Sequence, residues 1–223
     1  MWRLYHYTLC PYSRKARIAL GEKRVTFELV HEKPWERREA FLALNPAGLV
    51  PVLYETDSRQ VLADSTAIVE YLDETVAAEP LIGAAAAARA ETRRLVAWFD
   101  IKFYQEVTAL LYEERVWKRF IAKAAVTPAV VRAALYNVRG HLDYIGYLCD
   151  RRRWLAGDHF SAADIAAAAQ MSVVDYLGGI DWDSAGGARD WYVRVKSRPS
   201  FRPLLADRLT GVTPPPAYEK LDF

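Results

Sequence analysis

The N-terminal stretch alternates between apolar segments typical of strands and an amphipathic segment typical of a helix. Residues 2–7 and 25–30 are rich in aromatic and β-branched side chains, and they predict two strands. Between them, residues 11–20 repeat apolar positions at helical spacing, which predicts a helix with one apolar and one polar face. The charged residues expected on the polar face are Arg14, Lys15 and Arg17.

The pattern of apolar and turn residues predicts one more helix, a hairpin and a capped helix before residue 80. Residues 34–44 begin with proline and predict a short helix, and residues 49–54 predict a strand with proline near its start. Residues 60–63 return as the second strand of a hairpin. The pair Asp64-Ser65 then caps a helix that continues to Glu74. The predicted order is βαβαββα.

The remaining chain predicts helices and then a proline-rich end. Residues 84–120 are almost continuously helical in pattern, and their many aromatic side chains are each expected to pack in a core. Thr127 precedes proline and is expected to cap the next helix, and Ser161 and Asp164 form a reciprocal capping box before a very apolar helix. The predicted units are an α/β domain over residues 1–77, an all-helical domain over residues 84–210 and an extended tail over residues 211–223.

Composition narrows the possible environments and partners. The net charge of +2 predicts neither nucleic-acid binding nor attraction to a membrane surface. The two cysteines, Cys10 and Cys149, make no disulfide framework and fit a reducing compartment. No signal peptide or membrane-spanning run is expected, and no residue cluster predicts a metal site. We therefore expect a cytoplasmic protein.

The segment with the clearest chemical potential is Cys10-Pro-Tyr-Ser13, at the turn from the first strand to the first helix. Unpaired N–H groups and the dipole at the start of a helix favour a thiolate, and the same groups can hold an anion. Ser13 replaces the second cysteine of a C-x-x-C motif, so a disulfide cannot close within it, although a mixed disulfide with a small thiol could form. The alternative is that Cys10 is a small buried apolar residue.

Three segments together resemble the thioredoxin-like N-terminal domain of the glutathione S-transferase superfamily. They are Cys10-Pro-Tyr-Ser-Arg, Asn45-Pro-Ala-Gly-Leu-Val-Pro-Val-Leu and Asp64-Ser-Thr-Ala-Ile-Val-Glu-Tyr-Leu. The capping box at Ser161 and the helix expected over residues 191–198 resemble the helical C-terminal domain of that superfamily. The resemblance implies a thioredoxin-like domain followed by a helical bundle.

The resemblance also implies a glutathione site. Pro51 corresponds to the cis-proline of the family, and Val50 to the residue whose backbone pairs with the cysteinyl part of glutathione. Asp64 and Ser65 correspond to the residues that hold the γ-glutamyl end, and Lys33 is a candidate for the glycine carboxylate. The implied activity is cysteine-type thiol transfer or reduction, with Cys10 as the reactive cysteine and Ser13 or Tyr7 as a further donor to the thiolate.

A second hypothesis is that the chain is a binding protein without classical transferase activity. The segment over residues 34–48 and the proline-rich tail resemble a dimeric alphaproteobacterial branch of the superfamily that binds the tubulin-like division protein FtsZ. This resemblance implies a homodimer with FtsZ as its partner. The candidate contact residues are Trp35, Tyr218, Leu221, Asp222 and Phe223. Trp35 could instead pack against Phe41, and the tail could instead fold over its own domain.

Overall fold

A four-stranded sheet with the strand order β2-β1-β3-β4 forms the centre of the N-terminal domain, in a computed structural model that describes residues 1–222. Strand β1 runs parallel to β2 and antiparallel to β3, which pairs antiparallel with β4. The strands are β1 (Trp2–His6), β2 (Phe27–His31), β3 (Val52–Glu55) and β4 (Val61–Ala63). Strands β2 and β3 each begin two or three residues later than the sequence pattern predicts.

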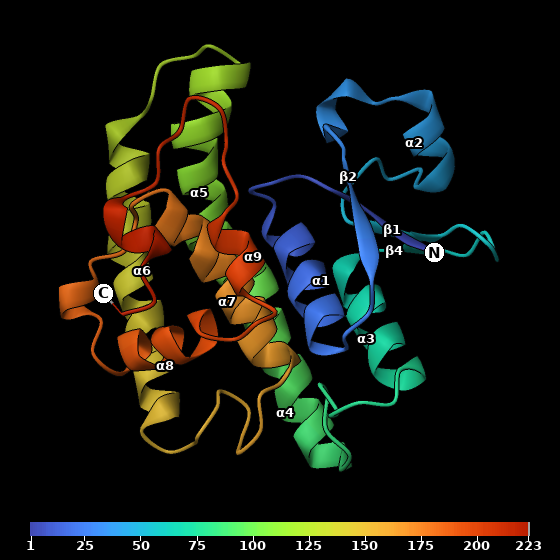
Figure 1. Ribbon diagram of the computed structural model, residues 1–223. Coiled ribbons are helices and arrows are strands. Elements are labelled where there is room, and N and C mark those ends of the chain that lie inside the picture. The colour runs from blue at the N-terminus through green and yellow to red at the C-terminus, as the bar shows by residue number, and fades with distance from the viewer. Residues whose placement is uncertain (223) are drawn as a thin grey trace.

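Three helices complete this domain and confirm the predicted order βαβαββα. They are α1 (Pro11–Glu22), α2 (Glu39–Leu44) and α3 (Ser65–Thr75). Figure 1 shows α1 and α3 on one side of the sheet, with α2 near its edge. The single helix predicted over residues 34–44 is wrong, because Arg37 adopts a left-handed conformation with φ 47°. That residue separates a 3₁₀ turn, η1 (Pro34–Glu36), from α2.

The rest of the protein is helical. One long helical stretch follows the segment 76–85 and continues from residue 86 to 121, as the sequence predicts, although its hydrogen-bonding pattern changes between α and π. Its parts are α4 (Ala86–Ala97), η2 (Trp98–Thr108), α5 (Ala109–Tyr112) and η3 (Glu113–Ile121). The later elements are α6 (Pro128–Cys149), α7 (Ala162–Tyr176), η4 (Trp182–Ser184), α8 (Gly187–Lys196), α9 (Arg202–Leu205) and η5 (Pro216–Glu219). Within residues 1–222, no helix has the length and apolarity needed to cross a bilayer.

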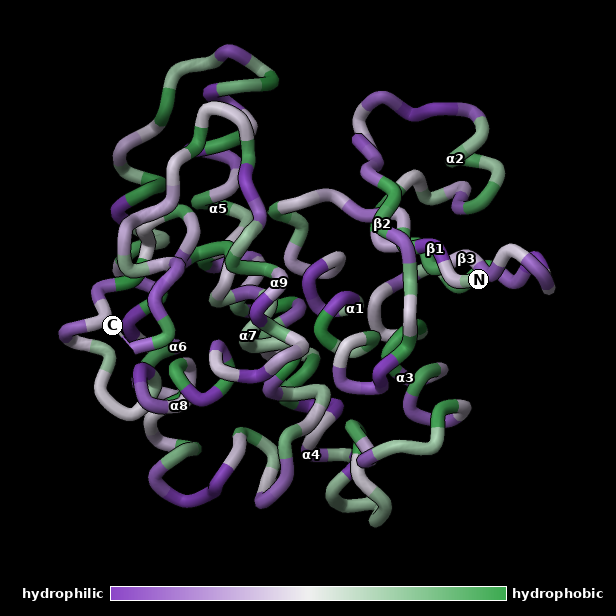
Figure 2. Tube along the Cα trace, viewed as in Figure 1, coloured by the Kyte–Doolittle hydropathy of each residue, from purple (hydrophilic) through white to green (hydrophobic). Residues whose placement is uncertain are grey.

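Helix α7 lies at the centre of the helical domain, and every one of its residues is buried. Figure 2 shows hydrophobic residues gathered along it. The predicted capping box fixes its first turn. The Ser161 hydroxyl accepts a hydrogen bond from the Ala163 N–H at 3.3 Å, while Asp164 accepts one from the Ser161 N–H at 3.0 Å. By contrast, the predicted side-chain cap at Thr127 is absent, because its hydroxyl accepts a hydrogen bond from Lys118 instead.

Helix α1 has no water-facing side, which corrects the expectation of a polar face. It lies between the sheet and α7, where Arg14, Lys15 and Arg17 are 0%, 1% and 6% exposed. Each of these cations forms an ion pair with an acid of the helical domain. Arg14 and Arg17 contact Asp207 at 3.1 and 2.8 Å, and Lys15 contacts Asp100 at 2.5 Å. The charges on α1 therefore join the two domains.

Candidate functional site

The side chain of Cys10 lies at the start of α1, where the sequence places it. Cys10 is the residue that precedes the first helical turn, and Pro11 occupies the first helical position, at which a missing N–H costs nothing. The Cys10 N–H bonds to the Tyr7 carbonyl at 3.0 Å, which forms the tight turn after β1. The Cys10 Sγ donates a weak hydrogen bond to the Val50 carbonyl at 3.8 Å. The thiol thus faces the loop that carries the cis-proline.

Burial of Cys10 works against the thiolate that the sequence predicts at this position. Burial raises the pKa of its thiol, because a charged sulfur loses its hydration in this position. Hydrogen bonds from Ser13 and the field of Arg14 act in the opposite direction but do not outweigh burial. Ser13 itself is 0% exposed, and its hydroxyl accepts a hydrogen bond from the Tyr7 N–H at 3.3 Å. Ser13 therefore stabilises the turn between β1 and α1 through its hydrogen bond with the Tyr7 backbone.

The loop before β3 brings Val50 and Pro51 against the Cys10 turn. The Val50–Pro51 peptide bond is cis, in line with the expectation from the family resemblance. Asn45 shapes this loop, because its side-chain amide donates to the Leu49 carbonyl at 2.8 Å and its oxygen accepts from the Ala47 N–H at 3.2 Å. Asn45 also lines the cleft, although the sequence did not single it out as a site residue.

Asp64 and Ser65 lie at the start of α3. Asp64 has a positive φ of 78°, and its Oδ1 accepts hydrogen bonds from the N–H groups of Thr66 at 2.6 Å and Ala67 at 3.3 Å. It is thus an ordinary helix cap as well as an exposed carboxylate beside the cleft. Ser65 is buried beside it. Because the cap already occupies the N–H groups of Thr66 and Ala67, the group at this helix start that best suits a ligand is the Asp64 carboxylate, which can pair with an ammonium.

A single cleft of about 1030 Å³ brings most of the predicted glutathione residues together. Cys10, Val50, Pro51, Asp64 and Ser65 all line it. Lys33 does not line it; its ammonium pairs with Glu36 at 3.0 Å on the surface. Among the described residues, no group of three or more histidine, cysteine, aspartate or glutamate side chains could hold a metal ion.

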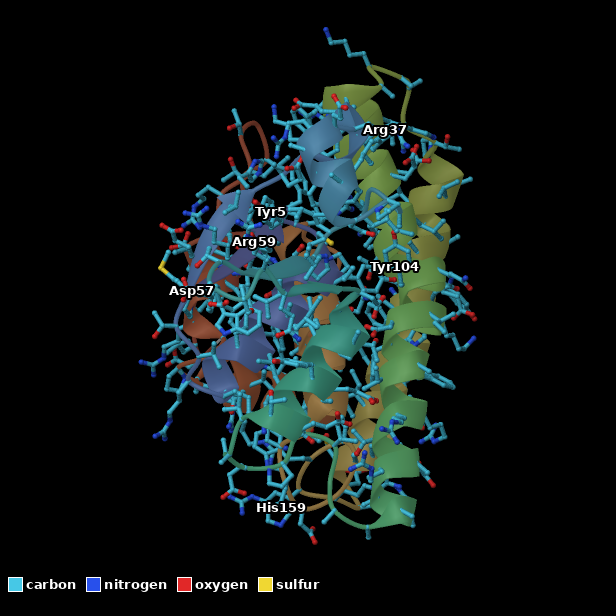
Figure 3. All side chains as sticks on the ribbon, turned by 90° about the vertical axis from the view of Figure 1, so that its right-hand side faces the viewer. Tyr5, Arg37, Asp57, Arg59, Tyr104 and His159 are labelled. Carbon is cyan, nitrogen blue, oxygen red and sulfur yellow. The ribbon has the colours of Figure 1, made fainter. Side chains whose placement is uncertain are left out.

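The opposite wall of the cleft is aromatic and comes from the long helix. Figure 3 shows Tyr104 on the side of that helix that faces the thioredoxin-like half. Its ring lies 5.2 Å from that of Tyr12, and Tyr112 and Trp117 line the same wall. We expected these rings to pack in a core, as Phe99 does. The high aromatic density of residues 98–120 was the available signal for this wall.

The floor of the cleft contains the buried pair of Lys15 and Asp100. The Lys15 ammonium also donates to the Thr66 hydroxyl at 2.9 Å, so it connects α1, α3 and η2. The Tyr12 hydroxyl donates to the Asp100 backbone carbonyl at 2.7 Å. Sequence reasoning missed this pair, because periodicity alone assigns Lys15 to a water-facing side of α1.

The candidate partner-binding residues do not form one surface. The Trp35 ring is half-buried, and its centroid lies 5.0 Å from that of Tyr7 and 5.6 Å from that of Trp117. It belongs to the hydrophobic cluster around Phe41. Tyr218 is 0% exposed and packs on its own domain, so it is not available to a partner as the chain folds here. Leu221 is half-buried and Asp222 is exposed, and Phe223 lies outside the described residues.

Comparison with known proteins identifies the family. Residues 4–80 match the model of the glutathione S-transferase N-terminal domain. The chain is 45% identical to FtsZ-localized protein A of Caulobacter vibrioides, over 99% of this chain and 97% of that protein. The chain therefore belongs to the glutathione S-transferase superfamily.

Two solved structures extend this comparison over the whole chain. The structure of FzlA from Caulobacter crescentus superimposes with a TM-score of 0.96 at 45% identity, covering 100% of this chain and 99% of that one. A glutathione S-transferase from Rhodospirillum rubrum superimposes with a TM-score of 0.97 at 51% identity, with complete coverage of both chains. The fold and the helical C-terminal domain expected from the sequence are confirmed.

Proposed function

We propose that this protein binds FtsZ in the cytoplasm as a homodimer and acts in cell division. The observation that carries the proposal is the similarity to FtsZ-localized protein A, which extends over nearly the full length of both chains. A second support is the end of the chain, where Glu219, Lys220 and Asp222 are exposed beside the half-buried Leu221. The homodimer is supported by exposed aromatic rings on α6, since Tyr136 and Tyr147 are 74% and 52% exposed.

The proposal predicts that the protein sediments with FtsZ polymers and that the end of the tail is needed. The double variant Leu221→Ala/Asp222→Ala should weaken the affinity for FtsZ by about tenfold, because an apolar and a charged contact are both removed. Cosedimentation across an FtsZ titration measures this change. The same protein in an analytical ultracentrifuge should have twice the chain mass of 25.3 kDa.

The matched control for this experiment is Asp158→Ala, which removes an exposed aspartate far from the tail in the sequence. It should bind FtsZ as the unmodified protein does. Equal binding by the double variant and the control would contradict the assignment of the tail end. Absence of the unmodified protein from the polymer pellet would contradict the proposed function itself.

A second candidate function is glutathione-dependent thiol chemistry at Cys10. It is favoured by one observation, the shared cleft that brings Cys10, Val50, Pro51, Asp64 and Ser65 together. In this arrangement the γ-glutamyl end would lie at the start of α3, and the thiol of glutathione would lie at the Cys10 turn. Cys10 would have to lose its proton on ligand binding, since burial raises its pKa.

Calorimetric titration of the reduced protein with glutathione tests this candidate. If the site is functional, Asp64→Asn and Asp64→Ala should each weaken binding by about tenfold, because both remove the charge that faces the ligand ammonium. Asn is as good a helix cap as Asp, so Asp64→Asn should keep the melting temperature while Asp64→Ala lowers it. Heat of binding that is unchanged in both variants, or missing in the unmodified protein, would exclude the γ-glutamyl subsite at Asp64.

A further inference from the structure

Tyr218 is completely buried although only five residues follow it in the sequence. Its hydroxyl donates a hydrogen bond to the Leu204 carbonyl at 3.0 Å and accepts one from Arg14 at 3.1 Å. Its ring meets the ring of Tyr176 edge-on, with centroids 5.1 Å apart. The residue therefore joins the tail to α9, α7 and α1 at once.

The Arg14 guanidinium that holds Tyr218 is itself 0% exposed. Burial of this charge is tolerated only because acceptors surround it. Besides the Tyr218 hydroxyl, Arg14 donates to the Thr8 carbonyl at 3.0 Å, the Ser172 hydroxyl at 2.9 Å and Asp207 at 3.1 Å. The Tyr218 hydroxyl is thus part of the shell that makes the buried cation stable.

Further bonds fasten the tail before Tyr218. The Tyr176 hydroxyl donates to the Val212 carbonyl at 2.9 Å and accepts from the Leu209 N–H at 2.9 Å. The buried Lys196 ammonium donates to the Ala217 carbonyl at 3.3 Å. Three consecutive prolines, at positions 214–216, restrict the backbone in between. Figure 1 shows this red segment lying along the helical domain.

The residues after Tyr218 differ sharply from those before it. Glu219, Lys220 and Asp222 are exposed, and Leu221 is half-buried. Glu219 pairs with Arg208 at the surface, which continues the attachment for one more residue. The backbone is therefore held up to Glu219, while the side chains after Tyr218 are mostly exposed to solvent.

We propose that Tyr218 is a positioning residue for partner binding: it anchors the tail so that residues 219–222 form a preformed contact surface. This inference rests on the proposed function, and it replaces the expectation that Tyr218 touches the partner. A segment that is already fixed has less conformational entropy to lose on binding than a free tail, so anchoring raises affinity without adding a contact. Tyr218 acts through residues 219–222.

The test uses Tyr218→Phe in the full-length protein, which keeps the ring and removes the hydroxyl. The N–H groups of Val212 and Tyr218 donate to the Leu209 and Pro215 carbonyls at 3.0 and 2.9 Å. Their hydrogen exchange should be slow in the unmodified protein without any partner, and about tenfold faster in Tyr218→Phe. FtsZ affinity, measured by cosedimentation, should fall severalfold. The matched control Tyr71→Phe also removes a hydroxyl that donates a hydrogen bond, to Gln60 at 3.1 Å, but on α3 of the thioredoxin-like domain, and it should change neither quantity.

A double-variant comparison separates anchoring from contact. In the Leu221→Ala/Asp222→Ala background, Tyr218→Phe should still speed exchange but should have little further effect on FtsZ affinity, because Tyr218 acts through the altered residues. An equal loss of affinity in both backgrounds would overturn the inference in favour of direct contact. Fast exchange of the Val212 and Tyr218 amides in the unmodified protein would also overturn it. If exchange is slow in the unmodified protein but neither it nor any variant binds FtsZ, Tyr218 does anchor the tail and the proposed function is wrong.

Discussion

Replacing Asp164 with Ala should lower the free energy of unfolding by about 4 kcal/mol, the largest effect expected from any single change considered for this protein. Asp164 is 0% exposed at the start of α7. Its Oδ1 accepts hydrogen bonds from the Leu155 N–H at 3.0 Å and the Trp191 indole at 2.9 Å. Its Oδ2 accepts from the N–H and the hydroxyl of Ser161, both at 3.0 Å. Alanine would leave these donors buried without an acceptor.

Urea unfolding followed by circular dichroism measures the loss, and two further variants test its cause. Asp164→Asn keeps the shape but turns an amide N–H₂ toward two of the donors, so it should also destabilise strongly. Ser161→Ala removes only the hydroxyl of the capping box and should cost about 1 kcal/mol. If Asp164→Ala lowered the free energy of unfolding no more than Ser161→Ala does, the hydrogen bonds from Leu155 and Trp191 to the Asp164 carboxylate would not be what stabilises the packing of α7 on α8 and the preceding loop.

Acidification should destabilise the protein through His6, by about 3 kcal/mol between pH 6.5 and pH 4. Burial, with a smaller contribution from the positive charge of Arg17, lowers the pKa of His6 from 6.5 to about 4. No described residue lies within hydrogen-bond range of its Nδ1, so no acceptor there stabilises a protonated ring. The unfolded chain takes up the proton first as the pH falls. The stability from neutral His6 is therefore complete above pH 6.5 and is lost as the pH approaches 4.

The His6 contribution is measured as a difference between two pH profiles. Urea unfolding of the unmodified protein and of His6→Gln at half-unit steps from pH 7.5 to 4 gives that difference. Glutamine does not titrate in this range, so the two profiles should converge as the pH falls. The control His31→Gln changes the neighbouring ring on β2 and leaves His6 in place, so it should retain the acid-induced loss. Parallel profiles for the unmodified protein and His6→Gln would refute the assignment to His6.

The order of elements could be predicted from the sequence because each element carries a local signal. The capping box at Ser161, the proline at the start of α1 and the Asp64 cap all act within one helical turn. The errors have two sources, a local backbone conformation and a contact with another helix. Arg37 breaks a helix through its left-handed backbone, and the Thr127 hydroxyl binds Lys118 on another helix instead of capping its own.

The sequence predicted the site residues that come from the thioredoxin-like domain, but not those that come from the long helix of the second domain. Residues such as Cys10, Pro51 and Asp64 occupy turns with recognisable motifs, whereas Tyr104 and Asp100 lie on a long helix whose orientation the sequence does not reveal. Charge was misleading for the same reason. Lys15 has the spacing of a solvated residue, but docking of the second domain covers it and supplies its counter-ion.

The ion pairs along α1 have a consequence for how the protein can be divided. A thioredoxin-like fragment cut near residue 80 would lose Asp100 and Asp207 and would leave Arg14, Lys15 and Arg17 without counter-charges beside newly uncovered apolar surface. A helical fragment would in turn keep two acids whose basic partners are gone. The two halves are thus separate in architecture but share one interior, and they should melt as a single cooperative unit.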